Sequence, residues 1–322
     1  MGSGVRGGRS PPCGKRARPV SAPKVSIVLP TRNGAGTLPD LLDAIARQRV
    51  DFTFEIVAVD SGSTDGTVDL LRGRVDRLIA IGADAFDHGL TRNLGIENAR
   101  GELIVLLVQD ALLASEGWLA ALTGAVAADD RIAGAFARQL PRPDAKAITR
   151  SYLSRWVAAS EVARTFEIDS RAAFDALDPG AQLERCAFDN VCSCIRRSVW
   201  RERPFAPTPI GEDIEWARAV LLAGYRLAYV PAAVVVHSHE RPVRYEFART
   251  CVLHRRLYEL FRLRTIPTLP LLARAIAASL AGHLRLERNA RAVGLALAWP
   301  LGQYLGALSA IRGWKPVRSR TV

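Results

Sequence analysis

The sequence predicts an α/β protein whose main domain is built on a mostly parallel sheet. Short apolar runs alternate with segments of helical periodicity from residue 25 to about residue 137, and the links between them are short. The run 103–108 holds six apolar residues in succession, which is too short for a membrane span and typical of a strand buried on both faces. Such alternation implies right-handed crossovers between parallel strands.

Composition and charge divide the 322-residue chain into three parts. Residues 1–24 hold six basic and no acidic residues and are rich in Gly, Pro and Ser, so we expect a disordered basic tail without a signal sequence. Residues 241–322 hold 15 basic and three acidic residues, which leaves a net charge of −6 on residues 25–240 of a chain whose net charge is +12. We therefore expect an α/β domain at 25–240 and a helical, basic and apolar region at 241–322.

The charge distribution also limits the partners. An acidic main domain argues against a nucleic-acid groove, and a basic C-terminal region fits an anionic partner, most simply a membrane surface. A solvated Arg-rich helical face is an equal alternative. Five cysteines are an odd number without paired spacing, which indicates free thiols in a reducing compartment. This predicts a cytoplasmic protein, with a peripheral position at the inner face of the cell membrane as the alternative that the basic region allows.

The elements of the first half follow from the apolar pattern and the turn residues. A helix at 39–48 has its apolar positions at helical spacing, a second helix starts at residue 68, and the segment DHGLTRNLGIENARG carries the third. Strands are expected at 25–30, 54–59, 77–81, 103–108 and 132–137.

The pattern is looser in the second half of the main domain. Helices and loops alternate from residue 145 to residue 181, and a helix at 212–223 is closed by Gly224. Strands are expected at 188–195, 227–230 and 234–237, the last two separated by Pro231 and Ala232.

Two apolar segments follow in the C-terminal region, at 265–284 and 292–311. The second has 20 uncharged residues between two arginines, which is long enough to span a bilayer. It contains Pro300, three glycines and many alanines, so its hydrophobicity is weak. This composition favours an interfacial or bundle-packed helix over a true span.

Polar residues follow three of the expected strands. The first strand ends in Thr31–Asn33, the second in Asp60 and the fourth in Gln109 and Asp110. Ligands of open α/β sheets bind outside the carboxyl ends of the strands. Turn formation or capping explains each of these residues separately, but their convergence on one edge favours a ligand site.

A partial dinucleotide fingerprint, Gly34-Ala35-Gly36, follows the first strand. Pro39 stands where the third glycine is needed for close packing of helix and strand, and no phosphate-binding loop of the GxxxxGK[ST] type is present. The fingerprint is incomplete, so a nucleotide-dependent oxidoreductase is kept only as an alternative. A non-catalytic module that binds a membrane or polyanion is a second alternative.

An ordered set of motifs carries a resemblance to a known family. LPTRN, VDSGSTDGT, FDHGLTRNLG, QDA, GEDIEW and HSH occur in this order and resemble a family 2 glycosyltransferase of GT-A fold. FDHGLTRN, VQDA with Trp118 downstream, ARQLP and the FDN…RRSVW segment resemble its bacterial rhamnosyltransferase-type branch. The resemblance covers about residues 25–240. It implies a Rossmann-like domain that binds a nucleotide-diphosphate sugar.

The resemblance also implies which residues bind the donor, of dTDP or UDP type. Asp60 would contact the base, Arg92 would lie near the phosphates, and Gln109 and Asp110 would lie at the diphosphate. The nucleotide pocket would be lined by Pro30, Thr31 and Asn33.

Asp110 would be the surviving acid of a DxD-type motif, bound to the diphosphate through Mg²⁺ or Mn²⁺. These ions take oxygen ligands and bridge one or two carboxylates to phosphates. Val108 stands where an Asp often occurs, so the protein would supply a minimal metal site. In the family a histidine at the position of His237 or His239 completes the metal site or touches the diphosphate, and His237 is slightly favoured over His239. Both side chains point to one face of a strand. His88 is a weaker candidate with a structural alternative.

The same resemblance makes Asp213 the general base and Glu212 a residue that orients the site. A helix N-terminus is the structural alternative, because acids in the first turn are stabilised by the helix dipole. The implied reaction is an inverting transfer of a hexose or deoxyhexose such as rhamnose to a hydroxyl of a glycan or lipid-linked acceptor. Cys192 and Cys194 are expected to pack in the core.

Overall fold

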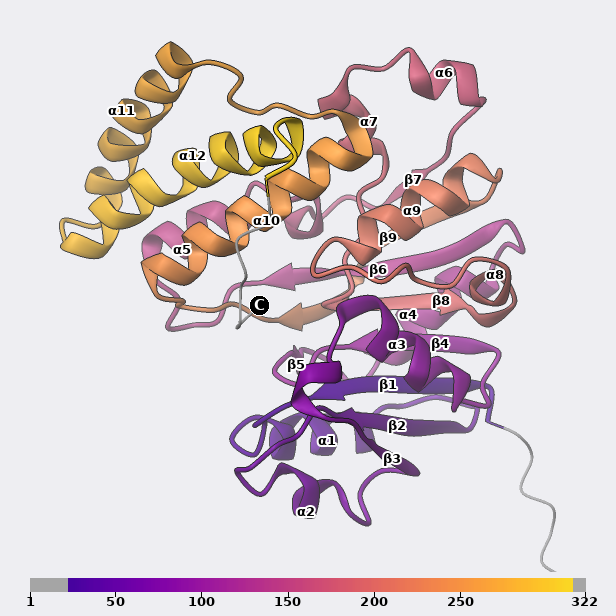
Figure 1. Cartoon of the computed structure of the whole chain (residues 1–322). Coiled ribbons are helices and arrows are strands. Elements are labelled where there is room, and N and C mark those ends of the chain that lie inside the picture. Colours follow the sequence, from indigo (N-terminus) through magenta and orange to yellow (C-terminus); the bar gives the residue numbers. More distant parts are fainter. Residues whose placement is uncertain (1–22, 315–322) are drawn as a thin grey trace, which may run out of the picture.

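The structure, a computed structural model, describes residues 23–314 and contains one nine-stranded sheet with helices on both faces (Figure 1). The tail expected at 1–24 therefore falls almost wholly outside the described residues. The strand order is β3-β2-β1-β4-β8-β6-β9-β5, and β7 pairs with β9. Six strands run in one direction and β8, β5 and β7 run in the opposite direction, so the expected mostly parallel sheet is confirmed.

The first half of the sheet matches the predicted strands closely. Its four strands are all parallel, because each is connected to the next by a helical crossover. They are β1 (Val25–Thr31), β2 (Phe54–Asp60), β3 (Arg77–Ala80) and β4 (Leu103–Leu107).

The second half of the sheet corrects the expectation of simple parallel order. β8 (Cys192–Arg196) lies antiparallel between β4 and β6 (Ile132–Leu140), so β6 is not the neighbour of β4. The strand expected at 188–195 thus begins only at Cys192, and residues 188–191 form the connection into it. This connection reaches the carboxyl end of β4, because antiparallel strands bring a start beside an end.

The two short strands expected around Pro231 are a single strand, β9 (Arg226–Val236), parallel to β6. The register between them jumps, since Ala137 pairs with Val230 and Arg138 pairs with Val234. Proline has no N–H to donate to the ladder, so the residues around it bulge out without ending the strand. Two strands, β5 (Leu112–Leu113) and β7 (Arg164–Phe166), were not predicted, because they are too short to show a period in the sequence.

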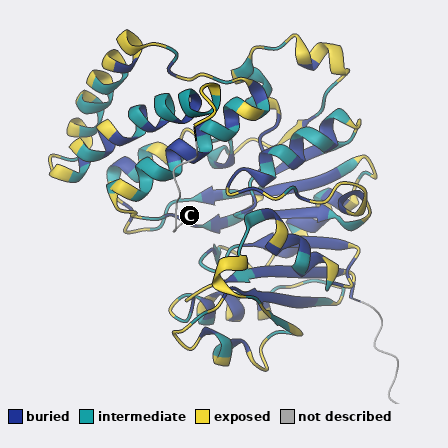
Figure 2. Cartoon of the chain, in the orientation of Figure 1, coloured by how far each residue is buried: buried dark blue, intermediate teal, exposed yellow. Residues whose placement is uncertain are grey.

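Two apolar layers cover the sheet. On one face α1 (Leu38–Ala46) and α4 (Trp118–Ala127) pack over Ile27 and Val105. On the other, α3 (His88–Glu97) and α9 (Glu212–Leu222) pack over Val28 and Phe136. The strands are consequently buried on both faces (Figure 2). The remaining helices of this half are α2 (Thr67–Leu71), α5 (Ala147–Leu153), α6 (Arg171–Asp175), α7 (Pro179–Arg185) and α8 (Arg197–Glu202), with 3₁₀ turns at Ala83–Ala85 and Val157–Ala159.

Three long helices follow the sheet. α10 (Val243–Phe261) lies along α12 (Ala290–Ile311), and α11 (Leu269–Leu286) packs on α12 (Figure 1). Gly302 and Gly306 of α12 face Thr250 and Cys251 of α10 so closely that an added Cβ would lie within 3.0 Å of an atom of α10. The segment 292–311 is therefore packed in a helix bundle. Within residues 23–314, no helix combines the length and the apolar character needed to cross a bilayer.

The four cysteines in the described part of the chain are free and buried. Cys192 and Cys194 lie in the core, as expected, within one of its two apolar clusters. Burial raises the pKa of Cys186 to about 12 and that of Cys251 to about 11, so these thiols stay protonated at neutral pH.

Candidate active site

One edge of the sheet collects the polar residues singled out from the sequence. The carboxyl ends of β1, β2, β4, β6 and β9 meet there, since these strands run in one direction. The residues before β8 join them, because Val191 accepts a hydrogen bond from the backbone N–H of Val108 (3.1 Å). Ends of six strands therefore contribute to one site.

The loops after β1 and β2 are joined through Asp60. This carboxylate is 1% exposed and accepts hydrogen bonds from Thr31 Oγ1 (3.1 Å), Ser63 N (2.9 Å) and Ser63 Oγ (2.5 Å). Asn33, whose φ is +48°, donates from its backbone N–H to Ser63 Oγ (2.8 Å). Three hydrogen bonds from two residues hold Asp60 in place, so it orders the loops beside the expected nucleotide pocket. Contact with a base stays a prediction.

Gln109 holds the loop after β1 from the other side. Its side-chain amide accepts from Arg32 N (2.9 Å) and donates to Arg32 O (2.8 Å). The backbone of a neighbouring strand would form the same pair of hydrogen bonds. A Cβ on Gly34 would lie 2.4 Å from Gln109 Oε1. The first glycine of the partial dinucleotide fingerprint is therefore explained by this amide rather than by the approach of a pyrophosphate.

Asp110, His237 and His239 form a cluster with the arrangement of a metal site. One ligand atom from each lies within 4.8 Å of the others. His237 Nε2 is 3.5 Å from Asp110 Oδ1, His239 Nε2 is 3.4 Å from Asp110 Oδ2, and the two Nε2 atoms are 3.0 Å apart. Two imidazoles and one carboxylate are a ligand set suited to a divalent ion, with remaining positions for substrate oxygens.

The electrostatics of this cluster favour a cation. Burial would raise the pKa of Asp110, but the contact with His237 and the nearby charges of His237, His239 and Arg142 outweigh it and lower the pKa to about 2. Burial, together with the neighbouring His237, lowers the pKa of His239 to about 4. At neutral pH the cluster therefore offers a carboxylate and a neutral imidazole, which are the forms that bind metals.

Two residues that contact this cluster were not assigned a role from the sequence, although both lie in or next to the ARQLP motif. Gln139 at the end of β6 is 2.8 Å from His237 Nδ1 and orients the ring, as partners of metal-binding histidines commonly do. Arg142 donates from its guanidinium to the backbone carbonyl of Asp110 and from its backbone N–H to Ser238 Oγ. Its positive charge therefore lies beside the carboxylate that would face a diphosphate.

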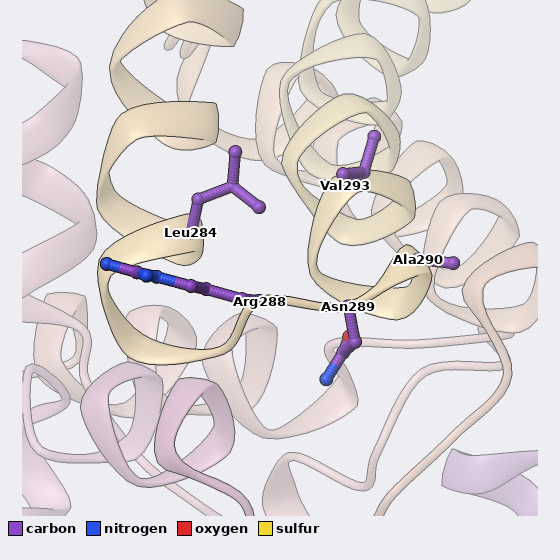
Figure 3. A pocket seen from close by; sticks show the side chains of 5 residues that line it. All are labelled: Leu284, Arg288, Asn289, Ala290 and Val293. Atoms are coloured by element: carbon purple, nitrogen blue, oxygen red, sulfur yellow. The ribbon is translucent and has the colours of Figure 1, made fainter.

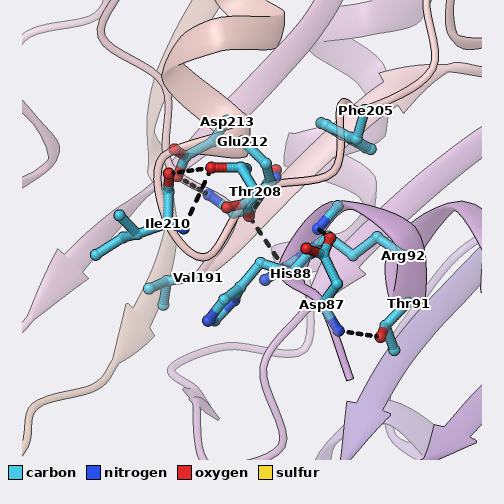
Figure 4. A network of polar contacts seen from close by, with 12 residues as sticks. Asp87, His88, Thr91, Arg92, Val191, Phe205, Thr208, Ile210, Glu212 and Asp213 are labelled. Atoms are coloured by element: carbon cyan, nitrogen blue, oxygen red, sulfur yellow. Dashed lines mark hydrogen bonds and ion pairs between the residues drawn. The ribbon is translucent and has the colours of Figure 1, made fainter. Parts of the chain in front are cut away.

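A second polar network joins α3 to α9 (Figure 4). Arg92 and Glu212 form an ion pair of 3.1 Å, with side chains 7% and 5% exposed. Arg92 also donates to the carbonyl of His88, the first residue of α3. Burial would raise the pKa of Glu212, but the charges of Arg92 and His88 lower it overall. Arg92 thus neutralises Glu212, and a place beside the phosphates stays a prediction for it.

The backbone of α3 approaches the 205–211 loop closely at Gly89. An added Cβ would lie 2.2 Å from the carbonyl oxygen of Ala206, so only glycine allows this contact. Within residues 23–314, His88 Nε2 is buried without a hydrogen-bond partner, and its ring contacts Phe86 edge-on with centroids 5.0 Å apart. The FDHG motif therefore sets the distance between the start of α3 and the 205–211 loop.

Asp213 lies one residue beyond Glu212 but in a different environment. Its carboxylate accepts from Ile214 N (2.8 Å) and Asn190 N (3.3 Å) while part of its surface stays accessible. Burial, followed by the charges of Glu212 and Asp189, raises the pKa of Asp213 to about 8. A carboxyl group with this pKa gains and loses its proton near pH 8, and its deprotonated form can act as a base.

Asp189 and Asn190 were missed as site residues, although the FDN motif that contains them was noted. Asp189 accepts from Val191 N (2.8 Å) and Trp156 Nε1 (3.3 Å), and burial raises its pKa. Asn190 donates from its backbone to Asp213 and from its amide to Glu212 Oε1 (3.3 Å). The segment before β8 thus links the acids of α9 to the end of β4.

The chain matches the family model Glycosyl transferase family 2 over residues 26–178. It is 32% identical over 235 residues to the O-antigen chain rhamnosyltransferase RfbN of Salmonella typhimurium, covering 70% of each chain. It is 28% identical over 233 residues to the O-antigen chain rhamnosyltransferase WbaN of Salmonella anatum, again covering 70% of each. A PGL/p-HBAD biosynthesis glycosyltransferase of Mycobacterium tuberculosis shares 41% identity over 97 residues, or 28% of this chain and 37% of that protein.

Solved structures of glycosyltransferases share the fold. The mannosyltransferase PcManGT from Pyrobaculum calidifontis, in complex with GDP-Man and Mn²⁺, has a TM-score of 0.53 and 21% identity over 95% of this chain and 80% of that chain. Glucosyl-3-phosphoglycerate synthase from Mycobacterium tuberculosis, with Mg²⁺ and uridine-diphosphate, has a TM-score of 0.53 and 20% identity over 75% of this chain and 80% of that chain. The expected GT-A fold is thereby confirmed.

Proposed function

Because this chain belongs to glycosyl transferase family 2 and is a glycosyltransferase with a nucleotide-sugar donor, we propose that it transfers rhamnose or another hexose with inversion. The acceptor would be a hydroxyl of a glycan or of a lipid-linked saccharide. Membership of the family removes the oxidoreductase and the non-catalytic module as alternatives. The rhamnosyl specificity is supported by the similarity to two O-antigen chain rhamnosyltransferases.

One observation carries the mechanistic proposal: a candidate metal cluster and a carboxyl group with a raised pKa lie at the same edge of the sheet. Asp110, His237 and His239 lie at the ends of β4 and β9, and Asp213 is joined to the start of β8 through Asn190. β8 is the direct neighbour of β4. This arrangement supports a site in which the cluster would bind the leaving diphosphate and Asp213 would meet the attacking hydroxyl.

The diphosphate of a dTDP- or UDP-type donor would bind at Asp110 through Mg²⁺ or Mn²⁺. The residues present fit such an ion, because the cluster holds one ionised carboxylate and imidazole nitrogens in reach of one another. When bound, the ion would stabilise the charge that develops on the departing nucleoside diphosphate. Gln139 would keep the His237 ring in place, and the guanidinium of Arg142 would add positive charge beside the diphosphate.

Asp213 would act as the general base. It would take the proton of the acceptor hydroxyl while the hydroxyl oxygen bonds to the anomeric carbon and the bond from that carbon to the diphosphate oxygen breaks. Attack from the face opposite the leaving group inverts the configuration. Glu212, held by Arg92 and Asn190, would orient the start of α9 and with it Asp213.

A lipid-linked acceptor would also imply a membrane contact and a location for the enzyme. A lipid-linked acceptor would be met at the inner face of the cell membrane, and a basic C-terminal region would suit that surface. The contact belongs to the helices after residue 240 and is separate from the chemistry of the transfer.

The replacement Asp213→Asn tests the base directly. It keeps the shape of the side chain but removes its ability to accept a proton, so we expect the loss of one general base to slow transfer by about 10²–10⁴-fold. Donor binding, measured by calorimetry with the nucleoside diphosphate, is expected to persist. The exposed acid in Asp169→Asn is the control and should leave transfer unchanged. Transfer by Asp213→Asn at the rate of the unmodified enzyme would contradict the assignment of Asp213 as the general base.

A further inference from the structure

The outward face of α11 has an unusual composition for a helix that faces solvent. Surface helices normally carry polar residues on the face away from the core. Here every exposed residue is apolar or an arginine, and the face offers no acid, amide or hydroxyl. These residues are Leu269, Pro270, Leu271, Ala273, Arg274, Ala277, Ala278, Ala281, Leu284, Arg285 and Leu286. Such a face is more stable when an apolar partner covers it.

Exposed apolar side chains are concentrated in the same part of the molecule. Of the 11 large apolar side chains that are exposed within residues 23–314, eight belong to α11, α12 or the residues just after α12. They are Leu269, Leu271, Leu284, Leu286, Val293, Leu297, Ile311 and Trp314. In Figure 2 the two helices extend from the sheet, and exposed residues follow the whole length of α11. Concentrated exposed apolar surface marks an interaction site.

The charge of this region selects the kind of partner. Residues 262–314 contain seven arginines and one acid, Glu287. Glu287 accepts a hydrogen bond from the backbone N–H of Ile148 (3.0 Å) and so faces the main domain. A second copy of this chain on the same face would bring the arginines of both copies together, which is unfavourable. An apolar layer with an anionic surface is the complementary partner.

The turn between α11 and α12 also combines apolar side chains with an arginine (Figure 3). A hollow of about 550 Å³ is lined there by Leu284, Arg288, Asn289, Ala290 and Val293. In Figure 3 Leu284 and Val293 project from the two helices and the side chain of Arg288 extends below Leu284. One guanidinium beside aliphatic side chains suits a lipid phosphate at the edge of acyl chains.

This turn is held to the segment that leaves the histidine cluster. Arg291 at the start of α12 forms an ion pair with Glu240, the residue after His239. The other carboxylate oxygen of Glu240 accepts a hydrogen bond from Lys146 N (2.9 Å). The turn is therefore connected to the candidate metal cluster through a short, fixed path.

We propose that α11 and the α11–α12 turn dock on an anionic phospholipid bilayer, with the helix lying in the plane of the interface. Leu271 and Leu284 enter the boundary of the acyl chains, and Arg274, Arg285 and Arg288 lie at the phosphates. Docking brings the end of β9 close to the lipid surface, where a lipid-linked acceptor would be found. The contact is independent of the transfer reaction, and only its role in presenting the acceptor rests on the proposed function.

Vesicle flotation of the whole chain tests the contact without donor or acceptor. Vesicles of phosphatidylcholine with phosphatidylglycerol are compared with vesicles of phosphatidylcholine alone, at low and high salt. We expect binding to the anionic vesicles that weakens with salt, because salt screens the attraction between basic residues and such a surface. The double variant Arg274→Glu/Arg285→Glu should bind more weakly by about tenfold or more.

The control reverses the same number of charges elsewhere. Arg185→Glu/Arg201→Glu changes two exposed arginines on α7 and α8 and should bind like the unmodified protein. Leu271→Ser/Leu284→Ser should also weaken binding, and circular dichroism checks that each variant is folded.

The proposal is overturned if the unmodified protein does not bind anionic vesicles, if the α11 variants bind as the unmodified protein does, or if the control variant loses binding equally. Self-association through α11 without vesicle binding would assign the face to a second copy instead. Failure of the transfer reaction alone would leave these results unchanged.

Discussion

Two adjacent acids show how strongly the environment decides the role of a residue. Glu212 and Asp213 lie in the first turn of α9, yet the pKa of Glu212 is lowered and that of Asp213 is raised to about 8. Arg92 compensates the charge of Glu212 at 3.1 Å. Burial and the neighbouring acids disfavour the charge of Asp213, which fits a group that must accept a proton during the reaction.

The pH dependence of transfer should report the Asp213 carboxyl group. Only its deprotonated form can act as a base, so kcat/KM should rise with pH and level off above about pH 8. Asp189→Asn removes one of the charges that raise this pKa, and the rising limb should therefore move to lower pH. The measurement is kcat/KM against pH for both proteins. A limb at the same pH in both would show that Asp189 does not act on Asp213.

Because the pKa of Asp213 is raised, loss of its proton at high pH should lower the stability of the folded protein. The native state holds the proton up to about pH 8, whereas the unfolded chain releases it near the ordinary value of 3.8. The stabilising effect of this proton is complete below pH 3.8 and is lost as pH rises through about 8. Asp213→Asn has no such titration, so its melting temperature should exceed that of the unmodified protein by a few degrees near pH 8. The difference should shrink toward pH 4, and a constant difference would contradict the assignment.

At the level of elements, the position of α3 depends on its glycine-permitted contact with the 205–211 loop. Gly89 lies against the carbonyl of Ala206, and Asn93 further along α3 donates to the carbonyl of Phe205 (2.8 Å). These contacts hold the buried pair of Arg92 and Glu212 together. The helix is therefore placed by contacts with the backbone of the 205–211 loop as well as by its apolar face.

Gly89→Ala should displace α3 and weaken the site. A Cβ 2.2 Å from a backbone oxygen cannot be accommodated, so we expect a loss of stability of about 1–3 kcal/mol and weaker donor binding. Gly124→Ala is the matched control, because an added Cβ in α4 would meet no atom within 4 Å. That replacement should be neutral or stabilise by about 0.5–1 kcal/mol. Both effects can be followed by denaturant unfolding; equal stability of the two variants would contradict the account.

The sequence predicted the parallel half of the sheet because each strand there is a buried apolar run followed by a turn. β8 could not be placed, since nothing in CSCIR distinguishes an antiparallel neighbour of β4 from a parallel one. Asp110, Asp213 and His237 were found through ordered motifs. Asp189 and Arg142 were missed, because their relevance depends on contacts between segments far apart in the chain.

At the scale of the whole molecule, the two parts of the chain face different demands. The sheet with its covering helices brings six strand ends to one edge and positions the polar groups of the site. The helices after residue 240 pack against one another, and α11 exposes an apolar and basic face. The division at residue 240 stays a prediction. A transferase with a lipid-linked acceptor would need both parts, one for the donor and one for the surface on which the acceptor lies.

The metal dependence of donor-nucleotide binding is the decisive test of the proposed metal cluster. Calorimetric titration of dTDP and UDP into the unmodified protein, with Mn²⁺ and after chelation, measures it without an acceptor. We expect Mn²⁺ to raise the affinity for at least one of them by about tenfold or more, which is about 1.4 kcal/mol. Asp110→Asn and His237→Ala should lose this gain, and His283→Ala on α11 should keep it. An affinity that Mn²⁺ does not change, or a His237→Ala variant that responds fully to it, would contradict the account.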